Sequence, residues 1–466
     1  MVRTRSLTRS LASLRGAART PGRAFALAAI AGLSMALPVG AAGPALVKDI
    51  NASGDSNPGW FTALGEKVLF AAADAKGVEL WKTNGKASGT SRVKDIRPGG
   101  AGSDVTMIVG MGSFVLFVAD DGTHGRELWR SDGTAAGTKL VEDINPSGHA
   151  FTGFLPVLTR VGGKVWFAAD DGASGFEPWV SDGTAGGTRR VKDIDPGTGS
   201  SMPGEFTQLG SGVVYSASGP GSDRELWRST TSGSSTARLK DINGAGSSTP
   251  SGLVRAGSVI YFEAMTPSTG FELWKTDGTG GGTKMVKDIY LGVADSSPTS
   301  FAVVGGVVTF SAYDGTVSGL FVTDGTASGT KVAKDIAPGG NATINGAGVL
   351  DGSRIMAAGE LSDHELWRTK GTPSSTKKIK EINAGGAAQP GWITTLGRRV
   401  YFAADDGVKG AELWISDGTA SGTKRVADLR AGAAGSVPFF LVAANGAIWF
   451  SADDGSRGRE LWRFVP

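Results

Sequence analysis

The sequence predicts an all-β chain that closes into a β-propeller of nine four-stranded blades. Three observations support this fold class. A unit of roughly 47 residues repeats along the chain, each unit holds four short strand patterns, and the two ends of the chain share one unit. The unit occurs in nine copies. Eight blades is the alternative count, because most propellers have about four to eight.

Two columns of the repeat define its period. An aromatic residue recurs at intervals of roughly 46 to 50 residues, which is typical of propeller repeats. Its positions are Trp81, Trp129, Trp179, Trp227, Trp274, Phe321, Trp367, Trp414 and Trp462. The acidic residue of a Lys-Asp-Ile element has the same period, at Asp49, Asp95, Asp143, Asp193, Asp241, Asp288, Asp335, Glu381 and Asp428. A large aromatic side chain in the third strand of every blade suits packing between blades, so we assign the aromatic column to the core.

Each unit alternates short strand patterns with residues that favour turns. In the eighth unit, strands are predicted at 392–396, 399–404, 412–416 and 424–429. Asp-Gly and other Gly-centred breaks separate these strands, as is typical of hairpins. The Asp-Gly-Thr segment after the third strand is predicted to be a turn in which Asp caps the backbone and Gly has a positive φ.

The two ends of the chain favour a closed ring over an open stack. Residues 46–50 form a fourth-strand pattern that lacks its first three strands, and residues 460–466 end the chain after a third strand. We expect the N-terminal strand to complete the last blade, because this pairing covers an edge that would otherwise be exposed. An open solenoid would instead carry polar capping units.

The first residues of the chain form a basic and then apolar leader. Six arginines precede an apolar run at 24–37, and small residues follow that run. This layout is typical of a secretory signal peptide, so we assign 1–42 to a signal peptide and 43–466 to a single propeller domain. We therefore expect a secreted protein, either extracellular or periplasmic. A retained membrane anchor is the alternative.

The composition after the leader excludes several classes of protein. The chain has 47 basic and 44 acidic residues, and six of the basic ones lie in the leader, which leaves 41 against 44. Nothing in this balance indicates a basic patch, so we expect no nucleic-acid partner. No segment after the leader is apolar enough to span a membrane. The chain has no cysteine, which excludes disulfides and thiolate metal sites. We expect a monomer.

The repeated segment, seen as Glu-Leu-Trp-Arg-Ser-Asp-Gly-Thr from Glu127, resembles the bacterial repeat family named for its signature Glu-Leu-Trp-x-x-Asp-Gly-Thr. The resemblance covers nearly all of the chain after the leader. Four units depart from the signature, through Pro178 in the third, residues 229–232 in the fourth, Gly319 and Phe321 in the sixth, and Lys370 and Glu381 in the seventh. The resemblance implies an exported bacterial protein with a propeller-like architecture. It implies no common activity.

Paired carboxylates in the loops between second and third strands are candidate calcium ligands. They occur in four units, as Asp120 and Asp121, Asp170 and Asp171, Asp405 and Asp406, and Asp453 and Asp454. Carboxylate oxygens clustered in a short loop are ligands that Ca²⁺ prefers. A plain Asp-Gly turn is the alternative, and no other cofactor is expected.

One column at the beginning of the innermost strand breaks the symmetry of the ring. Two residues after a recurrent proline position, it holds aromatic residues in three units, as Trp60, Trp392 and Phe440. Ring closure makes the first, eighth and ninth units neighbours, so we expect these side chains in one sector of the channel mouth. An exposed aromatic cluster there would suit stacking on a sugar or contact with a protein. Sealing between blades is the alternative.

Catalysis has little support in the sequence. There are three histidines, and the local motifs of zinc metalloproteases and of serine hydrolases are absent. We therefore expect a non-catalytic recognition protein that binds a glycan or an extracellular or surface protein through the loops at the channel mouth. One alternative is an extracellular hydrolase or lyase that acts on a polysaccharide with carboxylates at the mouth. The other is a surface-layer or adhesive structural protein.

Overall fold

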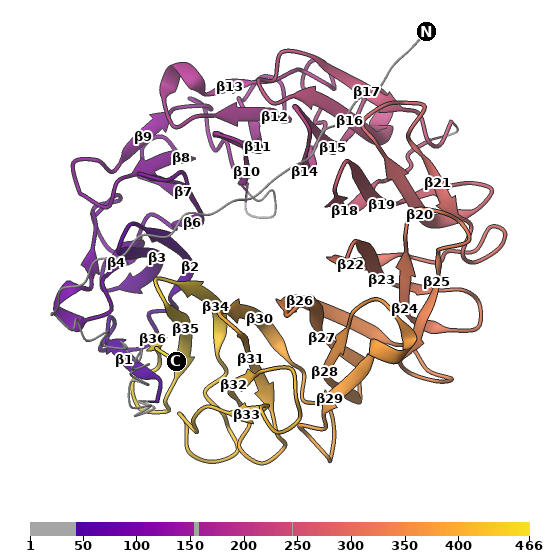
Figure 1. The fold of residues 1–466 in the computed structure, drawn as a ribbon. Coiled ribbons are helices and arrows are strands. Elements are labelled where there is room, and N and C mark those ends of the chain that lie inside the picture. The colour runs from indigo at the N-terminus through magenta and orange to yellow at the C-terminus, as the bar shows by residue number, and fades with distance from the viewer. Residues whose placement is uncertain (1–42, 153–157, 245) are drawn as a thin grey trace, which may run out of the picture. The chain divides into compact units, whose positions relative to one another are not determined.

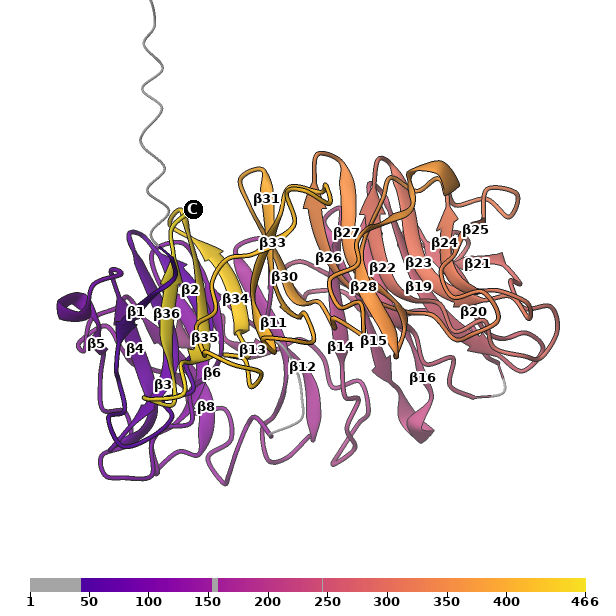
Figure 2. The same cartoon turned by 90° about the horizontal axis from the view of Figure 1, so that it is seen from below.

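Short β-strands separated by tight turns make up the computed structural model, which describes residues 43–152, 158–244 and 246–466. The strands form nine antiparallel sheets of four within these residues. Figure 1 shows the sheets as blades around a central axis, with the first strand of each blade innermost, and Figure 2 shows the same blades from the side. The predicted propeller of nine blades is confirmed, and the alternative count of eight is wrong. The predicted signal peptide, 1–42, lies outside the described residues.

The blades follow one another in chain order. The first three contain β2 (Gly59–Leu64), β3 (Lys67–Asp74), β4 (Gly77–Thr83) and β5 (Ser91–Arg92); β6 (Thr106–Gly110), β7 (Val115–Asp120), β8 (Arg126–Ser131) and β9 (Lys139–Glu142); and β10 (Thr159–Val161), β11 (Lys164–Asp170), β12 (Phe176–Ser181) and β13 (Arg189–Arg190). The next three contain β14 (Gly204–Leu209), β15 (Gly212–Ser218), β16 (Arg224–Thr230) and β17 (Thr236–Lys240); β18 (Ser251–Ala256), β19 (Val259–Thr266), β20 (Gly270–Thr276) and β21 (Lys284–Lys287); and β22 (Thr299–Val304), β23 (Val307–Tyr313), β24 (Ser318–Thr323) and β25 (Lys331–Asp335).

The seventh and eighth blades contain β26 (Thr343–Leu350), β27 (Ser353–Glu360), β28 (Asp363–Thr369) and β29 (Lys377–Lys380); and β30 (Gly391–Leu396), β31 (Arg399–Asp405), β32 (Ala411–Ser416) and β33 (Lys424–Arg425). The ninth contains β34 (Phe439–Ala444), β35 (Ala447–Asp453), β36 (Arg459–Phe464) and β1 (Ala45–Lys48). Short 3₁₀ turns lie between strands at η1 (Ala87–Gly89), η2 (Ala185–Gly187), η3 (Pro220–Ser222) and η4 (Pro373–Ser375).

The ninth blade combines both ends of the chain. Strand β1 pairs antiparallel with β36, with Ala45 opposite Arg463 and Leu46 opposite Trp462. The first strand of the ninth blade, β34, also packs against β2 of the first blade. The predicted closure by the N-terminal strand is therefore confirmed.

Packing between neighbouring blades forms the core. Alternate residues of a strand face opposite sides of its sheet. In the first blade, Val68, Phe70 and Ala72 therefore pack towards the ninth blade, whereas Leu69 and Ala71 pack towards the second. The described residues hold nine such clusters, each between two adjacent blades. One cluster for each blade is what a closed ring requires.

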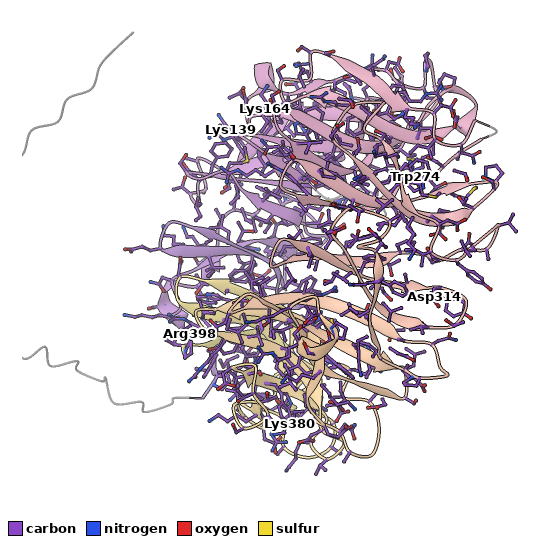
Figure 3. All side chains as sticks on the ribbon, turned by 45° about the vertical axis from the view of Figure 1, so that its right-hand side comes forward. Lys139, Lys164, Trp274, Asp314, Lys380 and Arg398 are labelled. Atoms are coloured by element: carbon purple, nitrogen blue, oxygen red, sulfur yellow. The ribbon has the colours of Figure 1, made fainter. Side chains whose placement is uncertain are left out.

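The tryptophan column belongs to this core, as predicted. Trp81 is 5% exposed and packs between the ninth and first blades. Lys48, from the Lys-Asp-Ile element of the ninth blade, lies over the Trp81 ring at 5.8 Å and donates a hydrogen bond of 3.0 Å to the carbonyl of Thr90. The same contact, a lysine over the tryptophan ring of the next blade, joins other neighbouring blades. The pairs are Lys94 and Trp129, Lys192 and Trp227, Lys240 and Trp274, and Lys380 and Trp414. Trp274 and Lys380 are labelled in Figure 3.

The glutamate before Leu-Trp has a role that the sequence analysis did not assign. Glu79 is fully buried, accepts hydrogen bonds from the backbone N–H groups of Ile96 (3.1 Å) and Arg97 (3.3 Å), and accepts one from the Ser103 hydroxyl (2.7 Å). It thus ties the third strand to the loop that leads into the next blade. We call this arrangement the glutamate clip. It recurs with Glu127, Glu177, Glu225, Glu272, Glu365, Glu412 and Glu460.

The fourth strand of the eighth blade is shorter than predicted, and the clip contacts lie beyond its end. The other three strands of this blade lie within one residue of their predicted bounds, but β33 ends at Arg425 rather than at residue 429. Just beyond β33, Val426 still donates its N–H to the carbonyl of Leu413 at 2.7 Å, and the N–H groups of Leu429 and Arg430 then donate to Glu412 at 3.2 Å each. A buried side chain therefore replaces the end of the β-ladder.

The sixth blade has Gly319 at the clip position and compensates with backbone pairing. Strand β25 continues to Asp335, which lies directly opposite Gly319. A Cβ atom at Gly319 would lie 2.5 Å from the carbonyl oxygen of Lys334, closer than any side chain allows. Glycine is therefore required for this close approach of two strands.

The clip of the second blade makes stability depend on pH. Burial raises the pKa of Glu127 to about 7, although backbone N–H donors oppose this shift. The native state therefore binds more protons than the unfolded state between the unfolded value of 4.5 and about 7. This contribution to stability is complete below the lower value and is lost as the pH rises through the upper one. We expect Tm to be highest near about pH 5 and to fall towards about pH 8, with a smaller fall in Glu127→Gln. Calorimetry that finds the same fall in both proteins would contradict this.

The second blade offers a way to strengthen its clip. Ala150 occupies the position that Ser103 has in the first blade, so Glu127 accepts the Ala150 N–H but no serine hydroxyl. We expect Ala150→Ser to add a hydroxyl donor, to lower the pKa of Glu127 and to raise the free energy of unfolding by about 1 kcal/mol. Urea denaturation would measure this gain in the free energy of unfolding. Ser103→Ala, which removes the equivalent hydroxyl from the first blade, should lower the free energy of unfolding. A loss of stability in Ala150→Ser would show that the hydroxyl does not reach the carboxylate.

Candidate functional site

Three aromatic side chains meet at the inner rim of the ring. Trp60, Trp392 and Phe440 lie near the beginning of β2, β30 and β34, the innermost strands of three adjacent blades (Figure 1). The ring centroid of Phe440 lies 6.0 Å from that of Trp60 and 4.9 Å from that of Trp392. Trp60 is 37% exposed and Trp392 is 43% exposed, so both present their rings to solvent. The structure thus brings together the three residues that the sequence placed in one sector.

A fourth aromatic residue extends this group. Phe439 is 41% exposed, and its ring centroid lies 5.6 Å from that of Trp392. We call Trp60, Trp392, Phe439 and Phe440 the aromatic cluster. The sequence analysis missed Phe439, because adjacent residues of a regular strand point to opposite faces. A shift of register between Phe439 and Val442 breaks that alternation.

The backbone at these positions is unusual. The values of φ are +58° at Trp60, +57° at Trp392 and +54° at Phe440, each within an irregularity of strand pairing. This left-handed conformation costs a residue other than glycine about 1 kcal/mol or more. Gly252 and Gly346 have the same position and conformation in the fifth and seventh blades. The repeat therefore accepts glycine here, and the backbone does not require an aromatic residue.

The same left-handed conformation occurs with other side chains elsewhere in the ring. They are Met107, Glu205 and Ser300. The equivalent residue of the third blade, Val157, lies outside the described residues. The left-handed conformation at this position is thus a property of the repeat, whereas the aromatic side chains occur there in only three adjacent blades.

A pocket of about 230 Å³ opens beside the aromatic cluster. Its walls are Asn57, Pro58, Phe439, Phe440, Ser451 and Arg459. They come from the first and ninth blades, so the pocket exists because the ring closes. It is smaller than the ~300–1,000 Å³ of sites for drug-sized molecules, and it therefore suits a single ring or side chain. Arg459 is its one ionisable wall residue.

The guanidinium of Arg459 is held at one edge. It lies over the Phe439 ring at 5.3 Å, and its Nη1 donates to the carbonyl of Val437 at 2.8 Å and to the Ser451 hydroxyl at 3.1 Å. Burial lowers the pKa of Arg459, while the charges of Asp453 and Asp55 oppose this shift. Arg459 was missed by the sequence analysis, and its position directly before the clip residue was the available signal.

The two carboxylates whose charges act on Arg459 do not form hydrogen bonds to its guanidinium. Asp453 pairs with Arg430, and an oxygen of Asp55 accepts the backbone N–H of Arg459 at 2.7 Å. Among the described residues, no carboxylate forms an ion pair with the Arg459 guanidinium. The pocket thus has one guanidinium that forms no direct ion pair within the described residues, although the charges of Asp453 and Asp55 act on it.

The predicted calcium ligands lie in four separate blades and make contacts within or near their own loops. Asp120 accepts the N–H of Gly122 at 2.7 Å and pairs with Arg97 at 2.9 Å. Asp121 accepts the N–H groups of Thr123 and His124, both at 2.9 Å. The same turn occurs at Asp170 and Asp171, Asp405 and Asp406, and Asp453 and Asp454. The geometry of these loops is that of an Asp-Gly turn, which was the alternative to calcium binding.

A different acidic group could hold a metal ion. Asp363, Glu365 and Glu381 of the seventh blade have carboxylate oxygens within 4.8 Å of one another. Lys378 already donates to Asp363 at 3.2 Å and to Glu381 at 2.7 Å, which neutralises part of this charge. The sequence did not indicate the triad because strand pairing brings its members together.

No family model and no curated protein matches the chain. Among solved structures, a crystal structure of puromycin hydrolase is similar at a TM-score of 0.40 and 15% identity, covering 88% of this chain and 60% of that one. A Mycobacterium tuberculosis puromycin-hydrolyzing peptidase is similar at a TM-score of 0.42 and 12% identity, covering 88% and 60%. Pyrococcus horikoshii acylaminoacyl peptidase gives a TM-score of 0.36 and 12% identity, covering 70% and 52%. The chain thus spans about 60% of the length of the puromycin-hydrolysing enzymes. Within the described residues, no helix is long and apolar enough to cross a membrane.

The contacts of the paired aspartates lead to a simple test. Their oxygens already accept backbone N–H groups and arginine donors, so Ca²⁺ would have to displace these partners. We expect Tm in excess Ca²⁺ to equal Tm in EDTA. A rise in Tm with Ca²⁺ that Asp120→Asn abolishes would instead locate an ion in the loop of the second blade.

Proposed function

We propose that this chain is a secreted, non-catalytic recognition protein that binds a glycan or an extracellular or surface protein at the channel mouth. The observation that carries the proposal is the aromatic cluster. The cluster lies on three adjacent blades. Its two tryptophans, Trp60 and Trp392, are exposed and occupy positions where glycine would relieve backbone strain. Exposed aromatic residues around a pocket are typical anchors of binding sites.

The chemistry of the pocket supports binding rather than hydrolysis. Glycoside hydrolysis uses a pair of carboxyl groups on either side of the scissile bond. The walls of this pocket hold a guanidinium, a hydroxyl, an amide and aromatic rings, and none of them is acidic. These groups can orient and hold a ligand, but they do not form an acid and base pair.

Export belongs to the same proposal and is supported by the sequence alone. The basic and apolar leader at 1–42 has the layout of a signal peptide. Membership of the repeat family with the signature Glu-Leu-Trp-x-x-Asp-Gly-Thr would agree with export. A rigid ring that presents variable side chains on its loops suits recognition outside the cell.

The cluster can be tested without disturbing the fold. We expect Trp60→Gly and Trp392→Gly to abolish ligand binding while changing Tm by only a few degrees, because relief of the left-handed strain offsets lost ring contacts. Binding would be measured on a glycan array and by capture of surface proteins, and Tm by calorimetry.

Met107→Gly is the matched control. Met107 has the same left-handed conformation, with φ of +58°, in the second blade and lies outside the aromatic cluster. It should retain binding. Full binding by both tryptophan variants, or unfolding of both, would assign the tryptophans to the structure of the ring instead.

A further inference from the structure

The arginine before the clip residue occurs in three blades, and its surroundings differ among them. In the second blade, Arg126 forms an ion pair with Asp104, which lies 22 positions earlier in the chain. In the ninth blade the residue 22 positions before Arg459 is Val437, which offers only its carbonyl oxygen. Among the described residues, Arg459 therefore lacks the direct ion pair that an equivalent arginine makes within its own blade.

The fourth blade gives a second comparison. Arg224 donates to the carbonyl of Met202 at 2.9 Å, in the same way as Arg459 donates to Val437. Glu205 lies close enough to Arg224 to oppose the burial that lowers its pKa. Glu205 occupies the column position that Phe440 has in the ninth blade. The column position beside Arg459 thus holds an aromatic ring, and the carboxylate charges that act on Arg459 come from Asp453 and Asp55 instead.

The contacts of Arg459 leave one side of its guanidinium available. Its Nη1 is occupied by Val437 and Ser451, whereas Nε and Nη2 make no hydrogen bond to any described residue. Nε and Nη2 together form a planar fork that matches the two oxygens of a carboxylate. The guanidinium lies over the Phe439 ring, with its central carbon 5.3 Å from the ring centroid.

We propose that the pocket binds an acidic sugar, a uronic acid residue of a polysaccharide, with its carboxylate on Arg459 and its ring against the aromatic cluster. This inference rests on the proposed function, whose ligand class it narrows. The pocket of about 230 Å³ accommodates a single ring. Trp60 and Trp392, exposed on either side of Phe440, provide stacking surfaces for neighbouring sugars of the same chain.

The test compares an acidic oligosaccharide with its neutral counterpart. The full chain without its leader would be titrated calorimetrically with trigalacturonate and with the neutral galactose trisaccharide. A charge-assisted hydrogen bond contributes about 1.5–3 kcal/mol, so we expect trigalacturonate to bind roughly 10- to 100-fold more tightly. We expect Arg459→Gln to remove this preference and Arg459→Lys, which keeps the charge but not the fork, to restore part of it.

Arg126→Gln is the matched control, because it removes an equivalent arginine that already has a counter-ion. It should leave binding unchanged. Equal binding of both trisaccharides that depends on Trp60 would overturn the acidic-sugar inference and leave the proposed function in place. Binding of a peptide with a free C-terminal carboxylate that depends on Arg459, without binding of trigalacturonate, would assign the pocket to a protein ligand. Two results together support both proposals. Trp60→Gly should lose binding of both trisaccharides, whereas Arg459→Gln should lose only the preference for trigalacturonate.

Discussion

In eight of the nine blades a buried carboxylate holds the loop that carries the chain from one blade to the next. Burial of a carboxylate costs free energy unless its oxygens are hydrogen-bonded. Each clip meets this requirement with backbone N–H groups of the loop and, in most blades, with a serine hydroxyl. The third strand and the outgoing loop are therefore fixed to each other. Because the loop leads directly to the innermost strand of the next blade, the clips position the rim of the channel.

The clip of the ninth blade has a particular consequence for the pocket. Glu460 accepts hydrogen bonds from the N–H groups of Ile50 and Ser56 and from the Ser56 hydroxyl. Ser56 is followed directly by Asn57 and Pro58, which form one wall of the pocket. Arg459, on the opposite wall, precedes the clip residue itself. The interaction that closes the ring thus also brings the two walls of the pocket together.

Residues that recur around the ring and residues that are particular to a few blades have different roles in this molecule. The clip, the tryptophan and the lysine that crosses to the next blade recur around the ring because every interface between blades has the same geometry. A binding site needs a departure from that symmetry. Within the described residues, the departures gather where the eighth, ninth and first blades adjoin, as exposed aromatic rings and an arginine whose guanidinium forms no ion pair.

The sequence by itself determined the number of blades, the strands within them and the closure of the ring. It could do so because hairpin turns, strand alternation and a regular period are local properties of the chain. It also placed Trp60, Trp392 and Phe440 in one sector, since closure makes their blades neighbours. Only the tertiary structure decided that Phe439 joins them and that Arg459 keeps a free fork. Both facts depend on a local bulge and on contacts between residues far apart in the chain, which no pattern in the sequence records.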